Sequence, residues 1–440
     1  MTVEEIIKIS DEQNISFIRL QFTDIFGIMK SIAVTRSQIK RILKDGCMFD
    51  GSSIEGFARI EESDMRLVPD LDTFVILPFS EEPGRVARLI CDVKNPDGTP
   101  FEADPRYVLR KVLKRAADMG YICNIGPECE FFLFNLDEAG NPTVQSNDAC
   151  GYFEIAPMDY GSLTRRSICL ALEKMGYEIE ASHHESANAQ HEIDFKYGEA
   201  LEIADKIITF KLAVKTIARE KGLYATFMPK PKHGHAGSGM HVNISLMKDG
   251  VNTFYDANGV GNLSKTALMF IAGVLKHAKG FTAITNPLIN SYKRLVSGYE
   301  APTNIAWSLR NRSPLVRVPV SNEKSARIEL RSPDPSCNPY LALAVIIGAG
   351  LDGIENQLTP PKSIDANIFK LSKEEKISQS IDALPTSLSE ALTELKKDKL
   401  IMEILGEQLS SIFINAKREE WSSYRTEVTV WELQHYLSKY

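Results

Sequence analysis

The first segment whose residues suit catalysis or metal binding contains two glutamates separated by one residue. Residues 126–134 read G-P-E-C-E-F-F-L-F, and the period-2 geometry of a β-strand places Glu128 and Glu130 on the same face. The apolar run that follows indicates a buried strand rather than an exposed edge. The sequence therefore predicts two neighbouring carboxylates on one buried surface.

Two further glutamates lie in the stretch 180–195. These are Glu185 and Glu192, and Glu192 opens another alternating segment. Taken alone this signal is weak. We interpret the histidines of the same stretch as surface or capping residues, namely His183, His184 and His191.

A glycine-rich turn leads into a third segment, residues 237–246, which reads G-S-G-M-H-V-N-I-S-L. Alternation puts His241, Asn243 and Ser245 on one face and apolar side chains on the other. Glycine lets the backbone approach a ligand closely, although most G-x-G pairs are structural. This segment therefore predicts a strand with one polar face.

A fourth segment aligns Arg327, Glu329 and Arg331 on one strand face. It belongs to the densest basic region of the chain. A solvated face would explain that charge, but apolar residues and prolines surround several of the arginines, and arginines fixed in this way suit phosphate and carboxylate recognition. The basic residues are Lys293, Arg294, Arg310, Arg312, Arg317, Lys324, Arg327 and Arg331.

If these strands are neighbours, five carboxylates and one imidazole share a cavity. Like charges at low dielectric shift their pKa values or bind cations, and two divalent ions would nearly neutralise five carboxylates. Oxygen ligands with a single imidazole favour magnesium or manganese over zinc. We therefore predict a two-metal site from Glu128, Glu130, Glu185, Glu192, Glu329 and His241.

Strands and helices alternate around these segments in an α+β arrangement. Residues 15–24 and 31–34 read as a β-hairpin after a first helix. The turn-rich stretch 94–105 then precedes a helix with Asp104 as its N-cap. We place a domain boundary there and predict an N-terminal domain over residues 1–100 and a second domain over 101–440. Long helices are expected at 201–221 and 265–282.

Composition excludes several classes of protein. The chain has 440 residues, 43% hydrophobic and 25% charged, with a net charge of −7, which argues against nucleic acid or a membrane surface as the main partner. The apolar stretch 340–350 is too short to span a bilayer and reads as a buried helix. Seven scattered cysteines without a C-x-x-C pair, and no secretory signal, predict a cytoplasmic chain with reduced thiols.

Over nearly its whole length the chain resembles bacterial type I glutamine synthetases. The resemblance rests on F-D-G-S-S at 49–53, G-P-E-C-E-F-F at 126–132, Q-H-E-I-D at 190–194, G-S-G-M-H at 237–241, N-S-Y-K-R-L-V-x-G-Y-E-A-P at 290–302 and N-R-S-P at 311–314. It implies an N-terminal β-grasp domain and a catalytic domain with a curved antiparallel sheet flanked by helices. It also implies a dodecamer of two hexameric rings whose active sites are shared between subunits.

The same resemblance implies a role for each matching residue. One metal would be held by Glu130, Glu185 and Glu192, and the other by Glu128, His241 and Glu329. ATP contacts would be Glu180, Tyr197, Asn243, Ser245, Arg317 and Lys324. Glutamate contacts would be Gly237, Arg294, Glu300, Arg312 and Arg331. Ala236 departs from the family, which usually has asparagine there, so one contact to glutamate is expected to be missing.

The implied reaction joins ammonia to glutamate in two steps. ATP phosphorylates the γ-carboxylate, and ammonia then displaces phosphate. Asp50 would bind ammonium and take its proton, Glu300 would close over the intermediate, and Arg312 and Arg331 would stabilise the transferred phosphoryl group. A ligase of the same superfamily that uses a larger amine is the alternative, against which the intact F-D-G-S-S motif argues. A catalytically idle scaffold is a second alternative, against which the filled metal positions argue.

Two positions address regulation. Phe369 stands where an adenylylated branch of the family has tyrosine, so no adenylylation is expected. Arg59 lies in a segment similar to that of the branch inhibited directly by glutamine, and we predict that it supports feedback inhibition. The resemblance also suggests nitrogen-responsive transcription regulators or small inhibitory proteins as partners.

Overall fold

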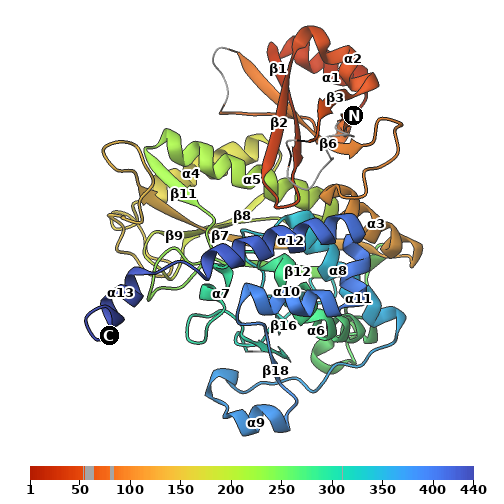
Figure 1. Ribbon diagram of the computed structural model, residues 1–440. Coiled ribbons are helices and arrows are strands. Elements are labelled where there is room, and N and C mark those ends of the chain that lie inside the picture. The colour runs from red at the N-terminus through yellow and green to blue at the C-terminus, as the bar shows by residue number, and fades with distance from the viewer. Residues whose placement is uncertain (53, 55–63, 80–83, 310) are drawn as a thin grey trace.

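A computed structural model describes residues 1–52, 54, 64–79, 84–309 and 311–440 (Figure 1). Arg59 and Arg310 lie outside the described residues. Among those residues, six strands form the N-terminal sheet in the order β2-β1-β6-β4-β3, with β5 on β6. Their bounds are β1 (Ile15–Thr23), β2 (Met29–Thr35), β3 (Cys47–Asp50), β4 (Asp64–Pro69), β5 (Val75–Ile76) and β6 (Arg85–Lys94).

The predicted hairpin is confirmed in this sheet. Strands β1 and β2 pair antiparallel, while β1 and β6, distant in sequence, pair in parallel. Helices α1 (Val3–Glu12) and α2 (Ile39–Asp45) accompany the sheet, and a capping box at Thr2 and Glu5 starts α1. A parallel central pair with a crossing helix is the β-grasp arrangement that the sequence predicts.

Within the described chain, ten further strands form a second, curved sheet. The path runs β15-β16-β17-β12-β7-β9-β8, with β10 and β11 on β7 and β13 on β12. Its pairs are antiparallel except for β15 and β16, which are parallel. The bounds are β7 (Ile122–Asn135), β8 (Ile179–His184), β9 (Gln190–Phe195), β10 (Gly198–Glu199), β11 (Leu223–Thr226), β12 (Met240–Lys248), β13 (Val251–Asn252), β15 (Trp307–Ser308), β16 (Val316–Arg317) and β17 (Ile328–Leu330).

Helices flank this sheet and fill the C-terminal quarter (Figure 1). Helix α3 starts as predicted, because the Asp104 side chain accepts from the Arg106 amide at 3.0 Å and Pro105 occupies the first turn. The larger helices are α3 (Pro105–Asp118), α4 (Ser162–Lys174), α5 (Ala200–Glu220), α6 (Lys265–Thr285), α8 (Pro339–Glu355), α10 (Leu388–Lys397), α11 (Lys399–Leu405), α12 (Glu407–Tyr424) and α13 (Val430–Tyr436).

Helices α6 and α8 cross closely because glycines face each other. A Cβ on Gly273 would lie 2.1 Å from the Ala349 carbonyl oxygen and 2.9 Å from the Gly353 Cα, so only glycine fits. Helix α6 is long and apolar enough to cross a membrane, but 78% of its apolar window is buried in the protein. The predicted buried helix at 340–350 is confirmed in α8.

Charged side chains connect the domain that contains the N-terminal sheet to the domain that contains the second sheet. Arg106 on α3 donates to Asp70 and Asp92 of the N-terminal part and, through two bonds of 2.8 and 3.0 Å, to Asp205 on α5. Because Arg106 is buried, these bonds fix the orientation of the N-terminal sheet. The boundary that we predict at residues 100 and 101 lies in the turn-rich connection between β6 and α3.

Candidate active site

Strand register places the predicted polar residues side by side. Glu128 on β7 pairs with His241 on β12, and Glu130 pairs with Glu192 on β9. Across the next pairing, Asn243 faces Glu329 of β17. Strands that are far apart in sequence therefore bring their polar faces to one surface.

One acidic group combines Glu128, His241 and Glu329. His241 Nδ1 lies 3.2 Å from Glu128 Oε2 and 3.8 Å from Glu329 Oε1. Glu329 is buried and also paired with cations, since Arg317 Nη1 donates to it at 2.6 Å and Arg331 contacts its other oxygen. Burial alone would raise the pKa of Glu128, but the hydrogen bond and charge of His241 lower that pKa to about 2.

A second acidic group lies on the neighbouring strands. His183 bridges it, with Nδ1 3.5 Å from Glu185 Oε1 and Nε2 3.3 Å from Glu192 Oε1. Glu130, opposite Glu192, accepts from Gln190 Nε2 at 2.7 Å and from the Gly239 amide at 2.8 Å. Burial and the neighbouring carboxylates raise the pKa values of Glu130, Glu185 and Glu192.

Both groups fit a hard divalent cation. The ligating atoms of Glu128, His241 and Glu329 lie within 4.8 Å of one another, as do those of His183, Glu185 and Glu192. The donors are mainly carboxylate oxygens, which magnesium and manganese prefer. Burial and mutual repulsion disfavour the charged forms of the second group, and a bound metal would favour them.

Our interpretation of the three histidines as surface or capping residues is wrong. His184 and His191 are fully buried, and His183 lies between two acidic side chains. The reason is tertiary, because α4 packs against strands β8 and β9 and its Arg165 donates to His191 Nδ1 at 2.8 Å. The local sequence alone does not reveal that helix α4 buries these histidines.

Two site residues escaped the sequence reasoning. Asp194, two residues after Glu192, lies opposite Glu128, and burial followed by the charge of Glu128 raises its pKa. The alternation that starts at Glu192 could have identified it. Gln190, which donates both to Glu130 and to the Gly237 carbonyl, lies two residues before Glu192 on the same face and could have been identified in the same way.

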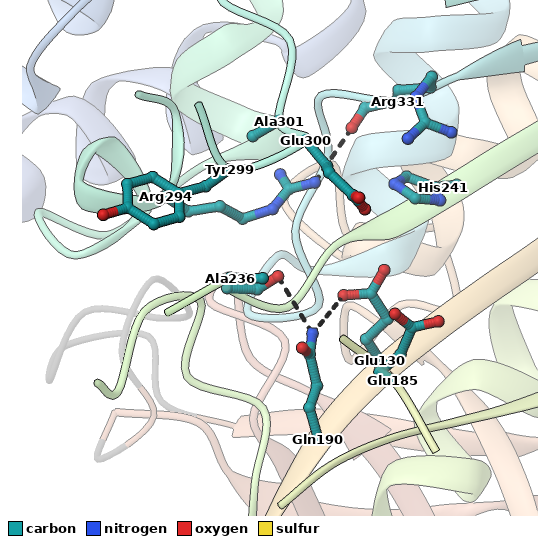
Figure 2. A pocket seen from close by; sticks show the side chains of 11 residues that line it. Glu130, Glu185, Gln190, Ala236, His241, Arg294, Tyr299, Glu300, Ala301 and Arg331 are labelled. Atoms are coloured by element: carbon teal, nitrogen blue, oxygen red, sulfur yellow. Dashed lines mark hydrogen bonds between the residues drawn. The ribbon is translucent and has the colours of Figure 1, made fainter. Parts of the chain in front are cut away.

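A pocket opens beside the second acidic group (Figure 2). Arg294 enters it from one wall, where its guanidinium donates to the carbonyls of Ser332, Pro333 and Arg331. The lining residues are Glu130, Glu185, Gln190, Ala236, Gly237, His241, Arg294, Tyr299, Glu300, Ala301 and Arg331. Acidic and basic side chains thus face each other across this pocket.

Two glycines let the loop before β12 reach this pocket. A Cβ on Gly237 would lie 2.2 Å from the Pro229 carbonyl oxygen, and one on Gly239 would lie 2.5 Å from Arg294 Nη2. Ala236 packs against the small apolar cluster that contains Phe132 and Phe134. The loop therefore follows the arginine closely because it lacks side chains there.

The loop that carries Glu300 covers the pocket. Glu300 has a left-handed backbone with φ of 64°, an uncommon conformation for a residue with a side chain. Its carboxylate points into the pocket toward His241 in Figure 2. Beside it, the Tyr299 ring lies 3.8 Å from Lys230 Nζ, a cation–π contact that ties this loop to the glycine-rich segment.

Two of the predicted ATP contacts, Asn243 and Arg317, reach the first acidic group. Asn243 Nδ2 donates to Glu128 at 2.9 Å, and its Oδ1 accepts from Arg327, a residue that we had not assigned to the site. A Cβ on Gly126 would lie 3.3 Å from Tyr197 Cβ and 3.6 Å from Asn243 Cβ, so both flank this glycine. Ser245 is half-buried further along β12, whereas Glu180 and Lys324 are exposed.

The remaining predicted residues lie at the edge of the site or away from it. Arg312 is exposed beside Tyr152, whose ring stacks on Phe153. Asp50 is exposed at the end of β3, where it accepts from the Ser52 amide at 2.8 Å, and it does not line the pocket in the described part of its own chain.

Comparison with known proteins identifies the family. The model of the glutamine synthetase β-Grasp domain matches residues 14–96, and that of the glutamine synthetase catalytic domain matches residues 102–436. Glutamine synthetases of Clostridium saccharobutylicum and of a Staphylococcus aureus strain are each 56% identical to the chain, covering 100% of it and 99% of their own length.

Solved structures agree with this assignment. A structure described as "GmaS/ADP complex-Conformation 1" has a TM-score of 0.89 and 35% identity, covering 98% of this chain and 99% of its own. A Plasmodium falciparum glutamine synthetase has a TM-score of 0.88 and 28% identity, with 99% of both chains covered. The chain therefore belongs to the glutamine synthetase family, the ATP-dependent ligases that join ammonia to the side-chain carboxylate of glutamate.

Proposed function

We propose that the two acidic groups would hold two divalent ions, Mg²⁺ or Mn²⁺, one in each group. Glu130, Glu185 and Glu192 hold one, and Glu128, His241 and Glu329 hold the other. The observation that carries this proposal is the pair of adjacent ligand clusters that open on one pocket. Bound metals would neutralise phosphate oxygens and hold the reactants in line.

ATP and glutamate then approach from opposite sides. ATP lies against Glu180, Tyr197, Asn243, Ser245, Arg317 and Lys324, near the first acidic group. The similar structure described as a complex of GmaS with ADP supports a nucleotide on this fold. Glutamate lies in the pocket, where Gly237, Arg294, Glu300, Arg312 and Arg331 contact it.

Charged side chains act on the two chemical steps. Arg331 and Arg312 stabilise the phosphoryl group as it moves to the γ-carboxylate. They also stabilise the adduct that forms when ammonia attacks. Asp50 binds ammonium and takes a proton, since only ammonia is a nucleophile. The Glu300 loop closes over γ-glutamyl phosphate and excludes water.

The assembly is a dodecamer of two hexameric rings, and Asp50 acts in the site of a neighbouring subunit. In the described part of the chain Asp50 does not line its own pocket, which is consistent with this arrangement, as are the exposed apolar side chains of α13, among them Trp431, Leu433 and Tyr436. Mixing inactive Asp50→Asn and Glu130→Gln subunits would restore activity in about a quarter of randomly paired sites. Mixed oligomers without activity would refute the shared site.

The central test varies the amine. Phosphate release from ATP is measured with glutamate and magnesium, with ammonia, methylamine, a polyamine or aniline as the acceptor. We expect ammonia to give the highest kcat/KM and glutamine to form in equal amount with phosphate. A larger amine that exceeded ammonia would instead identify a γ-glutamyl-amine ligase.

The enzyme works in the cytoplasm, where nitrogen-responsive regulators or small inhibitory proteins are its candidate partners.

Arg59 serves feedback inhibition by glutamine. An arginine close after the ammonia-binding segment can bias that segment between open and closed forms. We expect Arg59→Ala to keep catalysis and raise the inhibition constant of glutamine more than the KM of glutamate. Equal sensitivity of variant and parent would remove Arg59 from regulation.

A further inference from the structure

We propose that a buried polar cluster beneath the second acidic group positions Glu185 and Glu192 for metal binding, an inference that rests on the proposed metal site. The cluster, called the histidine platform below, consists of Asp148, Asp159, Arg165, His184 and His191. All five side chains are buried. None of them belongs to the ligand set or lines the pocket described above.

The platform lies on the opposite face of the metal-bearing strands. His184 directly precedes Glu185, His191 directly precedes Glu192, and the two histidines are cross-strand partners. The next pair, His183 and Glu192, faces the metal site. Side chains alternate between the two faces of a strand. Each platform histidine is therefore next to a proposed ligand in the chain, and its side chain points to the opposite face.

His184 connects the platform to the backbone of Glu185. Its Nδ1 donates to the Glu185 carbonyl at 2.7 Å, and its Nε2 lies 3.0 Å from Asp148 Oδ1. Asp148 Oδ1 also accepts from the Cys150 amide at 3.0 Å. The peptide group of Glu185 is therefore held by a side chain that is itself held at its other end.

Arg165 holds the second histidine in the same way. Its guanidinium donates to Asp159 through bonds of 2.7 and 3.0 Å and to His191 Nδ1 at 2.8 Å. Gly161 closes this side, since a Cβ there would lie 2.3 Å from His191 Cε1. The ring of His191, and with it the backbone next to Glu192, has little room to move.

The platform is better suited to positioning than to a third metal, although the four Asp and His side chains lie within ligand distance of one another. An arginine N–H occupies His191 Nδ1, so a neutral His191 carries its proton on Nε2 and offers no lone pair. Both nitrogens of His184 already face oxygen atoms. Arg165 supplies the positive charge that an ion would bring.

The test compares His184→Gln with His277→Gln. His277 is a matched control: it is also buried, its Nδ1 and Nε2 lie 2.7 Å from Asp398 and 3.0 Å from Asp352, and it belongs to α6. Mn²⁺ binding to the full-length proteins is titrated by electron paramagnetic resonance of free Mn²⁺, beside thermal unfolding. Asp148→Asn, which keeps the shape of the side chain, serves as a second platform variant.

We expect two binding classes in the parent. His184→Gln and Asp148→Asn should weaken one class about 10–100-fold and leave the other unchanged, as losses behind a ligand do. His277→Gln should lower the unfolding temperature with both classes intact. Folded platform variants with unchanged Mn²⁺ binding would overturn the positioning role, as would equal weakening by His277→Gln. A parent that binds no Mn²⁺ would instead overturn the proposed metal site on which it rests.

Discussion

The two acidic groups of the site differ in how their charge is compensated. Around Glu329, Arg317 and Arg331 supply two cations, and His241 stabilises the charged form of Glu128. Around Glu130, Glu185 and Glu192, carboxylates mainly meet other carboxylates, and the pKa values of all three are raised. The protein's own cations thus compensate much of the charge in one half, whereas the other half depends more strongly on the metal that we propose it binds.

This difference predicts unequal roles for metal in the two halves. The arginine-paired half can keep its charges without an ion, whereas the carboxylate-rich half holds protons until a cation replaces them. Metal binding should therefore release protons mainly from the carboxylate-rich half. Four changes test the comparison, beginning with the largest effect.

Glu130→Gln should abolish activity and yet not unfold the protein. It removes a charge that the proposed metal needs, and we expect kcat to fall by at least about 10²–10³-fold. Its volume is nearly unchanged, and its oxygen can still accept from the Gly239 amide. Steady-state kinetics at saturating magnesium measures the loss.

The stability of the same variant sharpens this prediction. Without metal, Glu130→Gln should unfold at the same temperature as the parent or higher, because an amide, unlike the carboxyl group, cannot ionise in this buried position. The control is Glu138→Gln at an exposed position, which should change neither kcat nor the unfolding temperature. Undiminished turnover of Glu130→Gln would contradict the two-metal assignment.

Arg317→Met should have the opposite effect on stability. It leaves buried Glu329 without a donor at 2.6 Å, and a lost hydrogen bond to a charged group costs about 1.5–3 kcal/mol. Adding Glu329→Gln should recover part of that loss, since the uncompensated charge disappears. Denaturant unfolding of the metal-free single and double variants measures the coupling.

If the double variant were no more stable than Arg317→Met alone, Arg317 would not be compensating Glu329. Magnesium offers an independent check. It should stabilise Arg317→Met more than the parent, because the ion replaces a missing charge. Equal stabilisation would mean that the arginine-paired half does not differ from its neighbour.

The pH dependence of metal-free stability should come largely from the carboxylate-rich half. Burial and neighbouring charge raise the pKa of Glu130 to about 8 and that of Asp194 to about 7. Between the ordinary pKa values, 4.5 for Glu130 and 3.8 for Asp194, and these raised values, the folded protein binds more protons than the unfolded chain. The contribution of these groups to stability is therefore greatest below about pH 4.5 and falls as pH rises toward 8.

Unfolding temperatures from pH 5 to 8, with a chelator or with magnesium, measure this dependence. The difference between the two series should widen as pH rises, because magnesium replaces the protons that are lost. Glu130→Gln should reduce the widening. A gap that is independent of pH would show that the acidic groups carry no excess protons in the folded state.

Local patterns predicted the faces of individual strands well. The alternation of β12 and the cap of α3 are fixed by neighbours in sequence, and both are confirmed. The compensation of the Glu329 charge by Arg317 was not predictable, because the two residues meet only through the pairing of β16 with β17. Buried Arg294 likewise bonds carbonyls nearly forty residues away.

The histidines show the same limit from the other side. His184 and His191 occur in a polar stretch, and only the packing of α4 makes their face an interior. Asp194, by contrast, was within reach of the sequence, since it continues the alternation from Glu192. The residue roles that rest on family resemblance remain predictions until the variants are measured.

The smallest expected effect concerns Ala236, at the entrance to the carboxylate-rich half. It packs against the small apolar cluster of Phe132, Phe134, Ala187 and Ala189, and it lines the pocket that we propose for glutamate. In Ala236→Asn the side chain could donate to bound glutamate, and one such bond is worth about 0.5–1.5 kcal/mol. We expect the KM for glutamate to fall a few-fold, with kcat and the apparent magnesium affinity unchanged, since the ligand carboxylates do not move. Ala236→Ser, which is shorter, should give a smaller change in the same direction. If Ala236→Asn altered magnesium affinity instead, the loop would act on the metal half rather than on glutamate, and the separation between the two halves would need revision.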